Sequence, residues 1–148
     1  MSHTYTNLIV HLVFSTKERK PLISEEIETE LHKYLGGLVK ELNGKPIKIG
    51  GMPDHVHLLA SLPPTVSTSD AMRFIKANSS KWVSEKFRKP FEWQKGYGAF
   101  SVSRSGMDAV AKYIENQEEH HKNNDFRDEF LELLKKYEVD FDTQYLWK

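Results

Sequence analysis

Apolar residues recur along this chain with two different periods, one typical of strands and the other of helices. Runs rich in β-branched and aromatic residues predict strands at 8–14, 46–49, 55–62 and 98–103. Helical spacing after capping residues predicts helices at 25–42, from Ser67 onward, at about 106–121 and at 126–137. The order β-α-β-β-α-β predicts an α+β fold, a ferredoxin-like or RRM-like split βαβ unit. Its sheet is antiparallel with helices on one face, and C-terminal helices follow.

The third predicted strand carries the pattern His55-Val56-His57. Side chains two apart on a strand point to the same face, so the two imidazoles lie on one face together. Val56 and the apolar residues that alternate with it form the opposite, core face. The histidines are therefore expected to be displayed on the surface. Two imidazoles this close can ligate one divalent ion, although a plain surface pair would show the same spacing.

Tyr113 and Gln117 lie four residues apart in the helix predicted at 106–121, so they share one face of it. A tyrosine hydroxyl, with a pKa of about 10, is a poor nucleophile until its target is polarised. A divalent cation bound to a phosphate polarises it as a Lewis acid. The histidine pair and the tyrosine are therefore chemically complementary. Taken alone, a helical tyrosine is more often a core or interface residue.

Length and composition indicate one globular domain over residues 1–148. The chain has no cysteine, which excludes a disulfide framework and a thiolate metal site. No apolar run approaches the roughly 20 residues that span a bilayer, and the opening residues lack a signal-peptide pattern. We therefore expect a cytoplasmic protein with no membrane partner.

Charge is balanced in total but uneven along the chain. Lys and Arg number 21, as do Asp and Glu, yet residues 73–104 hold eight basic and only two acidic residues. A basic stretch of this kind is typical of nucleic-acid binders, although a solvated helix face would produce the same pattern.

Five segments resemble, in one unbroken order, blocks of the HUH single-tyrosine insertion-sequence transposases, and of the REP-associated tyrosine transposases. They read HLVFSTK (11–17), GGMPDHVHLL (50–59), IKANSSKW (75–82), WQKGYGAFSVS (93–103) and YIENQEEHH (113–121). The similarity covers about residues 5–122. Val56 fills the hydrophobic position between the two histidines, and no catalytic position departs from the pattern. The chain after residue 123 matches nothing comparable.

The resemblance implies a transposase and endonuclease that cleaves and rejoins single-stranded DNA at hairpin-flanked ends. Tyr113 would attack a DNA phosphate, leaving a 5′-phosphotyrosine link and a free 3′-hydroxyl. His55, His57 and Gln117 would hold Mg²⁺ or Mn²⁺, since a carboxamide oxygen suits a hard cation. The resemblance also implies a homodimer with active sites shared between subunits. Gly106, before the tyrosine helix, can act as a hinge, so the sequence alone leaves cis and trans docking open.

With DNA as the substrate that the resemblance implies, the basic stretch at 73–104 supplies candidates for phosphate contacts. They are Arg73, Lys76, Lys81 and Arg104. Four aromatic residues of the same region are candidates for stacking on bases, and they are Trp82, Trp93, Tyr97 and Phe100. Of these, Trp82 and Phe100 suit the core better.

Two other functions remain open. One is a domesticated HUH nuclease that processes repeated palindromes without mobilising itself. The other is a non-catalytic nucleic-acid-binding module, because this fold class also serves sheet-based RNA binders. Against the module, the predicted sheet lacks an RNP-like aromatic strand. Imperfect palindromes at both borders of the gene would favour a mobile element over the domesticated enzyme.

Overall fold

A four-stranded antiparallel sheet forms the centre of the computed structural model, which describes residues 3–147. The strand order is β2-β3-β1-β4, and the strands are β1 (Leu8–Ser15), β2 (Lys45–Met52), β3 (His55–Leu62) and β4 (Gly98–Ser101). Strand β1 pairs with β3 on one side and with β4 on the other, and β2 pairs with the outer edge of β3. This order with antiparallel pairing is that of the split βαβ unit, so the predicted fold class is confirmed.

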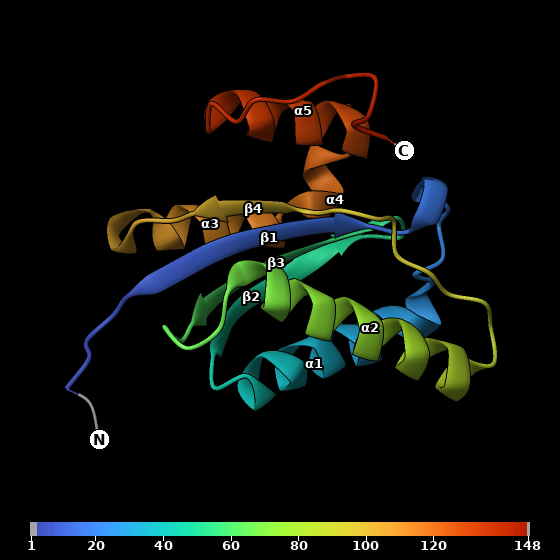
Figure 1. The fold of residues 1–148 in the computed structure, drawn as a ribbon. Coiled ribbons are helices and arrows are strands. Elements are labelled where there is room, and N and C mark those ends of the chain that lie inside the picture. The colour runs from blue at the N-terminus through green and yellow to red at the C-terminus, as the bar shows by residue number, and fades with distance from the viewer. Residues whose placement is uncertain (1–2, 148) are drawn as a thin grey trace.

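Two long helices, α1 (Glu25–Glu41) and α2 (Thr68–Phe87), cover one face of the sheet (Figure 1). Helix α2 begins where its capping residue predicts, because the Ser67 hydroxyl accepts the backbone N–H of Asp70 at 3.0 Å. The largest hydrophobic cluster lies between these helices and the sheet. It includes Leu12 of β1 and Val56 and Leu58 of β3. The apolar face read from alternation in β3 is thus the core face.

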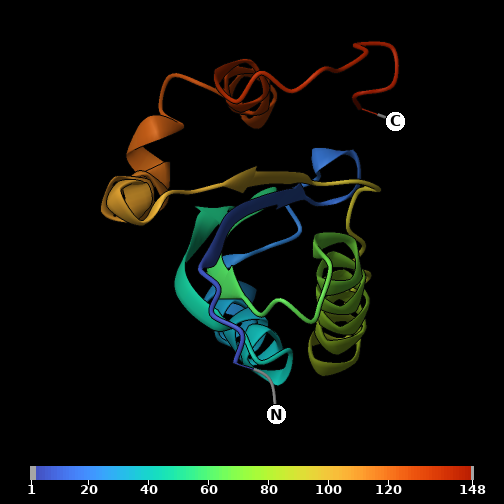
Figure 2. The same cartoon turned by 60° about the vertical axis from the view of Figure 1, so that its left-hand side comes forward.

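Shorter helices cover the other face of the sheet (Figures 1 and 2). They are α3 (Met107–Glu115), α4 (Gln117–His120) and α5 (Phe126–Lys136), and short 3₁₀ turns occupy η1 (Lys17–Arg19) and η2 (Arg104–Gly106). Their apolar side chains form two small clusters on the sheet, one around Ile114 and one around Phe126 and Leu134. This second layer buries the face that carries His55 and His57. The expectation that the imidazoles are displayed on the surface is therefore wrong. Alternation of apolar and polar residues in a strand distinguishes the two faces of a sheet, but it does not show whether helices also cover the polar face.

The helix predicted at 106–121 is interrupted. Helix α3 ends at Glu115, Asn116 leaves helical geometry with φ −95° and ψ 24°, and α4 then begins at Gln117. Helix α3 lies close against β2. A Cβ atom on Gly50 would come within 2.6 Å of the Ile114 carbonyl oxygen, so the absence of a side chain at Gly50 permits this contact. The residue after Tyr113 is thereby seated directly on the sheet.

Within residues 3–147, no helix is both long enough and apolar enough to cross a bilayer.

Candidate active site

Strand β3 places His55 and His57 side by side beneath the C-terminal helices, and neither side chain is exposed. The Nδ1 atom of His55 lies 2.7 Å from a carboxylate oxygen of Asp54. The Nδ1 atom of His57 lies 2.8 Å from Nε2 of His11, which comes from the neighbouring strand β1. These contacts fix both rings with Nε2 toward the C-terminal helices. Such a partner behind each imidazole is the usual arrangement around metal-ligating histidines.

A buried carboxylate from α5 meets these two rings. Oε1 of Glu129 lies 3.3 Å from Nε2 of His55, 3.1 Å from Nε2 of His57 and 3.0 Å from Nε2 of His121. Glu129 is fully buried. Sequence reasoning identified neither this residue nor His121 as part of the site. One signal was present, because Glu129 falls at helical spacing between Phe126 and Leu133, on the apolar face of its own helix.

Tyr113 and Gln117 reach the same carboxylate from above the sheet. The Tyr113 hydroxyl donates a hydrogen bond to Oε2 of Glu129, and Nε2 of Gln117 donates to that oxygen at 2.8 Å. Oε1 of Gln117 lies 2.9 Å from Nε2 of His55. The ring centroids of Tyr113 and His57 are 5.7 Å apart. The structure therefore brings the predicted tyrosine, histidines and glutamine together within one chain, despite the break at Asn116.

The pKa shifts follow from this crowding of buried groups. Burial lowers the pKa of His55, but hydrogen bonds to the carboxylates of Asp54 and Glu129 outweigh burial and raise the pKa to about 9. Burial opposes ionisation of Glu129, yet the hydrogen bonds from His55 and His57 hold its pKa well below the usual range. Burial and the hydrogen bond to Glu129 raise the pKa of Tyr113. At neutral pH the metal-free site therefore holds an ionised carboxylate beside an un-ionised tyrosine hydroxyl.

The donor atoms of this cluster suit a small divalent cation. Ligands at about 2.1 Å from Mg²⁺ lie roughly 3 Å from one another. Nε2 of His55 lies at this spacing from two oxygens, 2.9 Å from Oε1 of Gln117 and 3.3 Å from Oε1 of Glu129. Ligand atoms of His55, His121 and Glu129 all lie within 4.8 Å of one another. Imidazole, carboxamide and carboxylate donors are compatible with Mg²⁺ or Mn²⁺.

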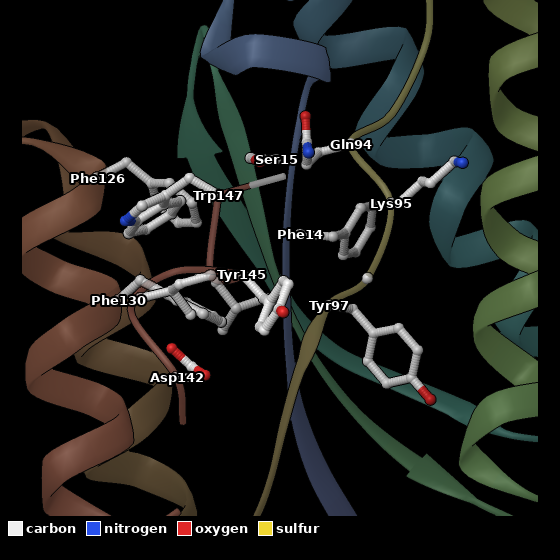
Figure 3. Close-up of a pocket in the computed structure, with 13 residues that line it drawn as sticks. Phe14, Ser15, Gln94, Lys95, Tyr97, Phe126, Phe130, Asp142, Tyr145 and Trp147 are labelled. Atoms are coloured by element: carbon white, nitrogen blue, oxygen red, sulfur yellow. The ribbon is translucent and has the colours of Figure 1, made fainter. Parts of the chain in front are cut away.

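One cavity opens onto the tyrosine, and a second lies on the far side of Phe126. A cavity of about 270 Å³ is lined by His11, Tyr113, Glu129 and Lys136, among others, and gives access to the tyrosine. A second cavity of about 430 Å³ has an aromatic lining (Figure 3). Figure 3 shows Phe126 and Phe130 of α5 on one side and Tyr97 and Lys95 on the other. The Phe126 ring also stacks on the His55 ring with centroids 4.4 Å apart, so Phe126 separates the aromatic cavity from the histidine.

The basic residues predicted to contact DNA lie away from this cluster. Arg73, Lys76 and Lys81 belong to α2, on the opposite face of the sheet, and Arg104 is exposed in η2. Arg73 pairs with Asp70 at 3.0 Å. The Lys76 ammonium donates to the carbonyl oxygens of Gln94 and Gly96, at 2.6 and 2.7 Å. Lys76 therefore supports the loop that carries Tyr97.

The four aromatic candidates for base stacking separate into core and surface. Phe100 is buried, as is Trp93, whose indole N–H donates to Ser79 at 2.9 Å. Trp82 stacks on Tyr34 with ring centroids 4.4 Å apart. Tyr97 is 38% exposed and lines the aromatic cavity. Of these four, Tyr97 alone is both exposed and part of the lining of the aromatic cavity.

Comparisons with known proteins agree with this site. The sequence profile of the family described as "Transposase IS200 like" matches residues 4–117. The transposase for insertion sequence element IS200 of Salmonella typhimurium is 28% identical over 129 residues, which cover 82% of this chain and 84% of that protein. The ISDra2 transposase TnpA of Deinococcus radiodurans is 28% identical over 114 residues, 72% of this chain and 81% of that protein.

Two solved structures share the fold. A Deinococcus radiodurans R1 protein described as a transposase superposes with a TM-score of 0.65 at 25% identity, over 79% of this chain and 95% of that one. A REP-associated tyrosine transposase bound to a REP hairpin superposes with a TM-score of 0.61, over 82% of this chain and 73% of that one. At 15% identity the second likeness shows the fold alone. With the family profile matched across the histidines, the tyrosine and the glutamine, this chain belongs to the IS200-like transposases, the HUH enzymes with a single tyrosine.

Proposed function

We propose that this chain is a metal-dependent transposase that cleaves and rejoins single-stranded DNA at hairpin-flanked ends, with Tyr113 as its nucleophile. The observation that carries the proposal is the position of the Tyr113 hydroxyl. It lies on a buried cluster that contains His55, His57 and Gln117, in a chain of the IS200-like family. A tyrosine with only a packing role would be surrounded by apolar side chains, whereas Tyr113 is surrounded by imidazoles, a carboxamide and a carboxylate.

The proposed cleavage exchanges one phosphoester for another. The Tyr113 oxygen forms a bond to phosphorus as the bond from phosphorus to the 3′ oxygen breaks. The phenolic proton leaves to solvent, and the departing 3′ oxygen takes up a proton. The 5′ phosphate stays on Tyr113, and a 3′-hydroxyl later reverses the step to reseal a strand. Because a phosphoester bond is retained throughout, the reaction needs no external energy source.

His55, His57 and Gln117 would hold Mg²⁺ or Mn²⁺. When bound, the cation supplies Lewis-acid polarisation of the scissile phosphate. Asp54 and His11 orient the two imidazoles from behind. Burial raises the pKa of Tyr113, so the hydroxyl is a weak nucleophile until its surroundings gain positive charge.

The proposed substrate is a hairpin with a single-stranded flank. The fold is shared with a tyrosine transposase solved with a REP hairpin, which supports this substrate class. We propose that the flank passes the cavity at Tyr113 and that a base enters the aromatic cavity beside Tyr97 and Lys95. Arg73, Lys76, Lys81 and Arg104 stay candidates for phosphate contacts, and their distance from the histidines suits contacts to the hairpin stem.

A homodimer with shared active sites is the last part of the proposal. In a single chain, Tyr113 lies beside its own histidines. Sharing would require α3 to leave that position and dock on a partner, with the bend at Gly106, where η2 meets α3.

The test of the proposed function is a covalent adduct. The protein, incubated with Mn²⁺ and an oligonucleotide that carries a hairpin and a flank, should form a protein–DNA band that survives denaturation. Tyr113→Phe should bind the oligonucleotide and form no band, whereas Tyr34→Phe, on the far face of the sheet, should behave as wild type. His57→Ala or EDTA should abolish the band. An undiminished adduct in Tyr113→Phe would refute the assignment.

A further inference from the structure

Glu129 is the most unusual residue of the site. It is a fully buried carboxylate on α5, beyond residues 4–117 that match the family profile. Its two oxygens contact different partners. Oε1 faces the imidazoles of His55, His57 and His121, while Oε2 accepts hydrogen bonds from Tyr113 and Gln117. A carboxylate in this position either takes part in metal binding and catalysis or blocks the site.

The hydrogen bonds around the imidazoles show where lone pairs must lie. Nδ1 of His55 faces a carboxylate oxygen of Asp54, and Nδ1 of His121 faces the carbonyl oxygen of Asn124 at 2.6 Å. Because both of these partners are acceptors, each Nδ1 must carry the proton. A neutral ring of this kind has a lone pair at Nε2. In the neutral state, which is the state that binds a metal, both Nε2 atoms therefore present lone pairs toward the interior of the site.

The atoms opposite are acceptors as well. The Gln117 amide is fixed because its Nε2 donates to Glu129, which turns Oε1 toward the imidazoles. Oε1 of Gln117 lies 3.0 Å from Nε2 of His121, and Oε1 of Glu129 lies equally close to that nitrogen. When the rings are neutral, two nitrogen and two oxygen lone pairs converge with no hydrogen between them. Without a metal ion, the proton that His55 shares with Glu129 occupies this place, and a bound cation would replace it.

We infer that Glu129 and His121 are ligands of the metal ion, so that the metal centre extends beyond His55, His57 and Gln117 into the C-terminal segment. This inference rests on the proposed function. Through Oε1 the carboxylate faces the cation position, and through Oε2 it holds the Tyr113 hydroxyl. Glu129 thereby ties the nucleophile to the metal centre. Its negative charge also strengthens the attraction of the site for a divalent cation.

Metal binding without DNA tests this inference. Full-length protein is titrated with MnCl₂, and free Mn²⁺ is followed by electron paramagnetic resonance. Loss of a partner behind a metal ligand costs about 10–100-fold in affinity, and loss of a ligand should cost at least as much. We expect this loss in Glu129→Gln and in His121→Asn. Asp128→Asn removes the neighbouring, exposed carboxylate of α5 and should leave Mn²⁺ affinity unchanged.

The outcomes separate the inference from the proposed function. Circular dichroism identifies variants that fail to fold, and Glu129→Asp, which keeps the charge, should then show intermediate Mn²⁺ affinity. Unchanged Mn²⁺ affinity in folded Glu129→Gln would overturn the inference, above all if DNA cleavage became faster, because the carboxylate would then be an obstruction. The proposed function survives that result if His57→Ala still abolishes the adduct. Absence of any Mn²⁺ binding by the wild type overturns the inference too.

Discussion

Replacing Gly50 with alanine adds one methyl group where the tyrosine helix rests on the sheet. The new Cβ would lie 2.6 Å from the carbonyl oxygen of Ile114, against about 3.4 Å for an ordinary contact. The helix therefore has to retreat by about 0.8 Å (3.4 − 2.6). Ile114 directly follows Tyr113, so the nucleophile moves with it. Residues that bind a metal or substrate are not altered by this change.

The expected effect on cleavage is large for so small a substitution. A displacement of about 1 Å at a reacting group can lower a rate by roughly 100-fold. We therefore expect adduct formation by Gly50→Ala to slow by about 10–100-fold in single-turnover assays with the hairpin oligonucleotide. Mn²⁺ affinity should fall much less, because the histidines stay on β3. Overpacking should lower the free energy of unfolding by about 1–3 kcal/mol, measured by urea titration.

Gly37 provides a matched control. It lies on α1, and a Cβ there meets nothing within 4 Å. Gly37→Ala should leave cleavage unchanged and stabilise the helix by up to about 1 kcal/mol. If Gly50→Ala cleaved DNA as fast as Gly37→Ala, the contact between Gly50 and Ile114 would not position the tyrosine, and the reasoning would be refuted.

Three further predictions concern protonation, DNA and assembly. In EDTA, the free energy of unfolding should fall as pH rises from 6.5 to 9. The folded state binds the His55 proton more tightly than the unfolded chain, because the pKa of His55 is raised from 6.5 to about 9. This stabilisation is fully present below pH 6.5 and is lost as pH rises through about 9. A melting temperature unchanged across this range, or falling equally in His55→Gln, would contradict this. Tyr97→Ala should weaken hairpin binding by about 1–3 kcal/mol in a fluorescence titration, and undiminished affinity would exclude base stacking there. Mixed Tyr113→Phe and His57→Ala subunits should regain cleavage if sites are shared, and no recovery would indicate self-contained sites.

The sequence predicts the sheet and the first helical layer well, because their signals are local. The alternation of Val56 and Leu58 with the histidines identifies the core face of β3, and the Ser67 cap marks the start of α2. The burial of the histidines depends on contacts between β3 and α5, some 70 residues apart in the chain. No local pattern in β3 reports such a contact. The nearly continuous apolarity of β1, from Leu8 to Phe14, is the sign that both faces of the sheet are covered.

The candidate site was predictable as far as the family pattern extends. His55, His57, Tyr113 and Gln117 fall on that pattern, and the structure brings them together. Glu129 lies outside the pattern, and its only sequence signal is an acidic residue on the apolar face of an amphipathic helix. From the sequence alone such a residue is ambiguous, because exposed glutamates at the border of an apolar stripe are common.

The two layers on the sheet differ in how their apolar side chains are distributed. The layer of α1 and α2 forms one continuous hydrophobic cluster, whereas the layer of α3, α4 and α5 forms two small clusters on either side of the histidines and Glu129. Segments with fewer apolar contacts open at lower free energy than the rest of a fold. Backbone amides of α3 and α5 should therefore exchange with deuterium sooner than those of α1. Opening of the layer of α3, α4 and α5 would uncover the histidines while the sheet, α1 and α2 stay folded.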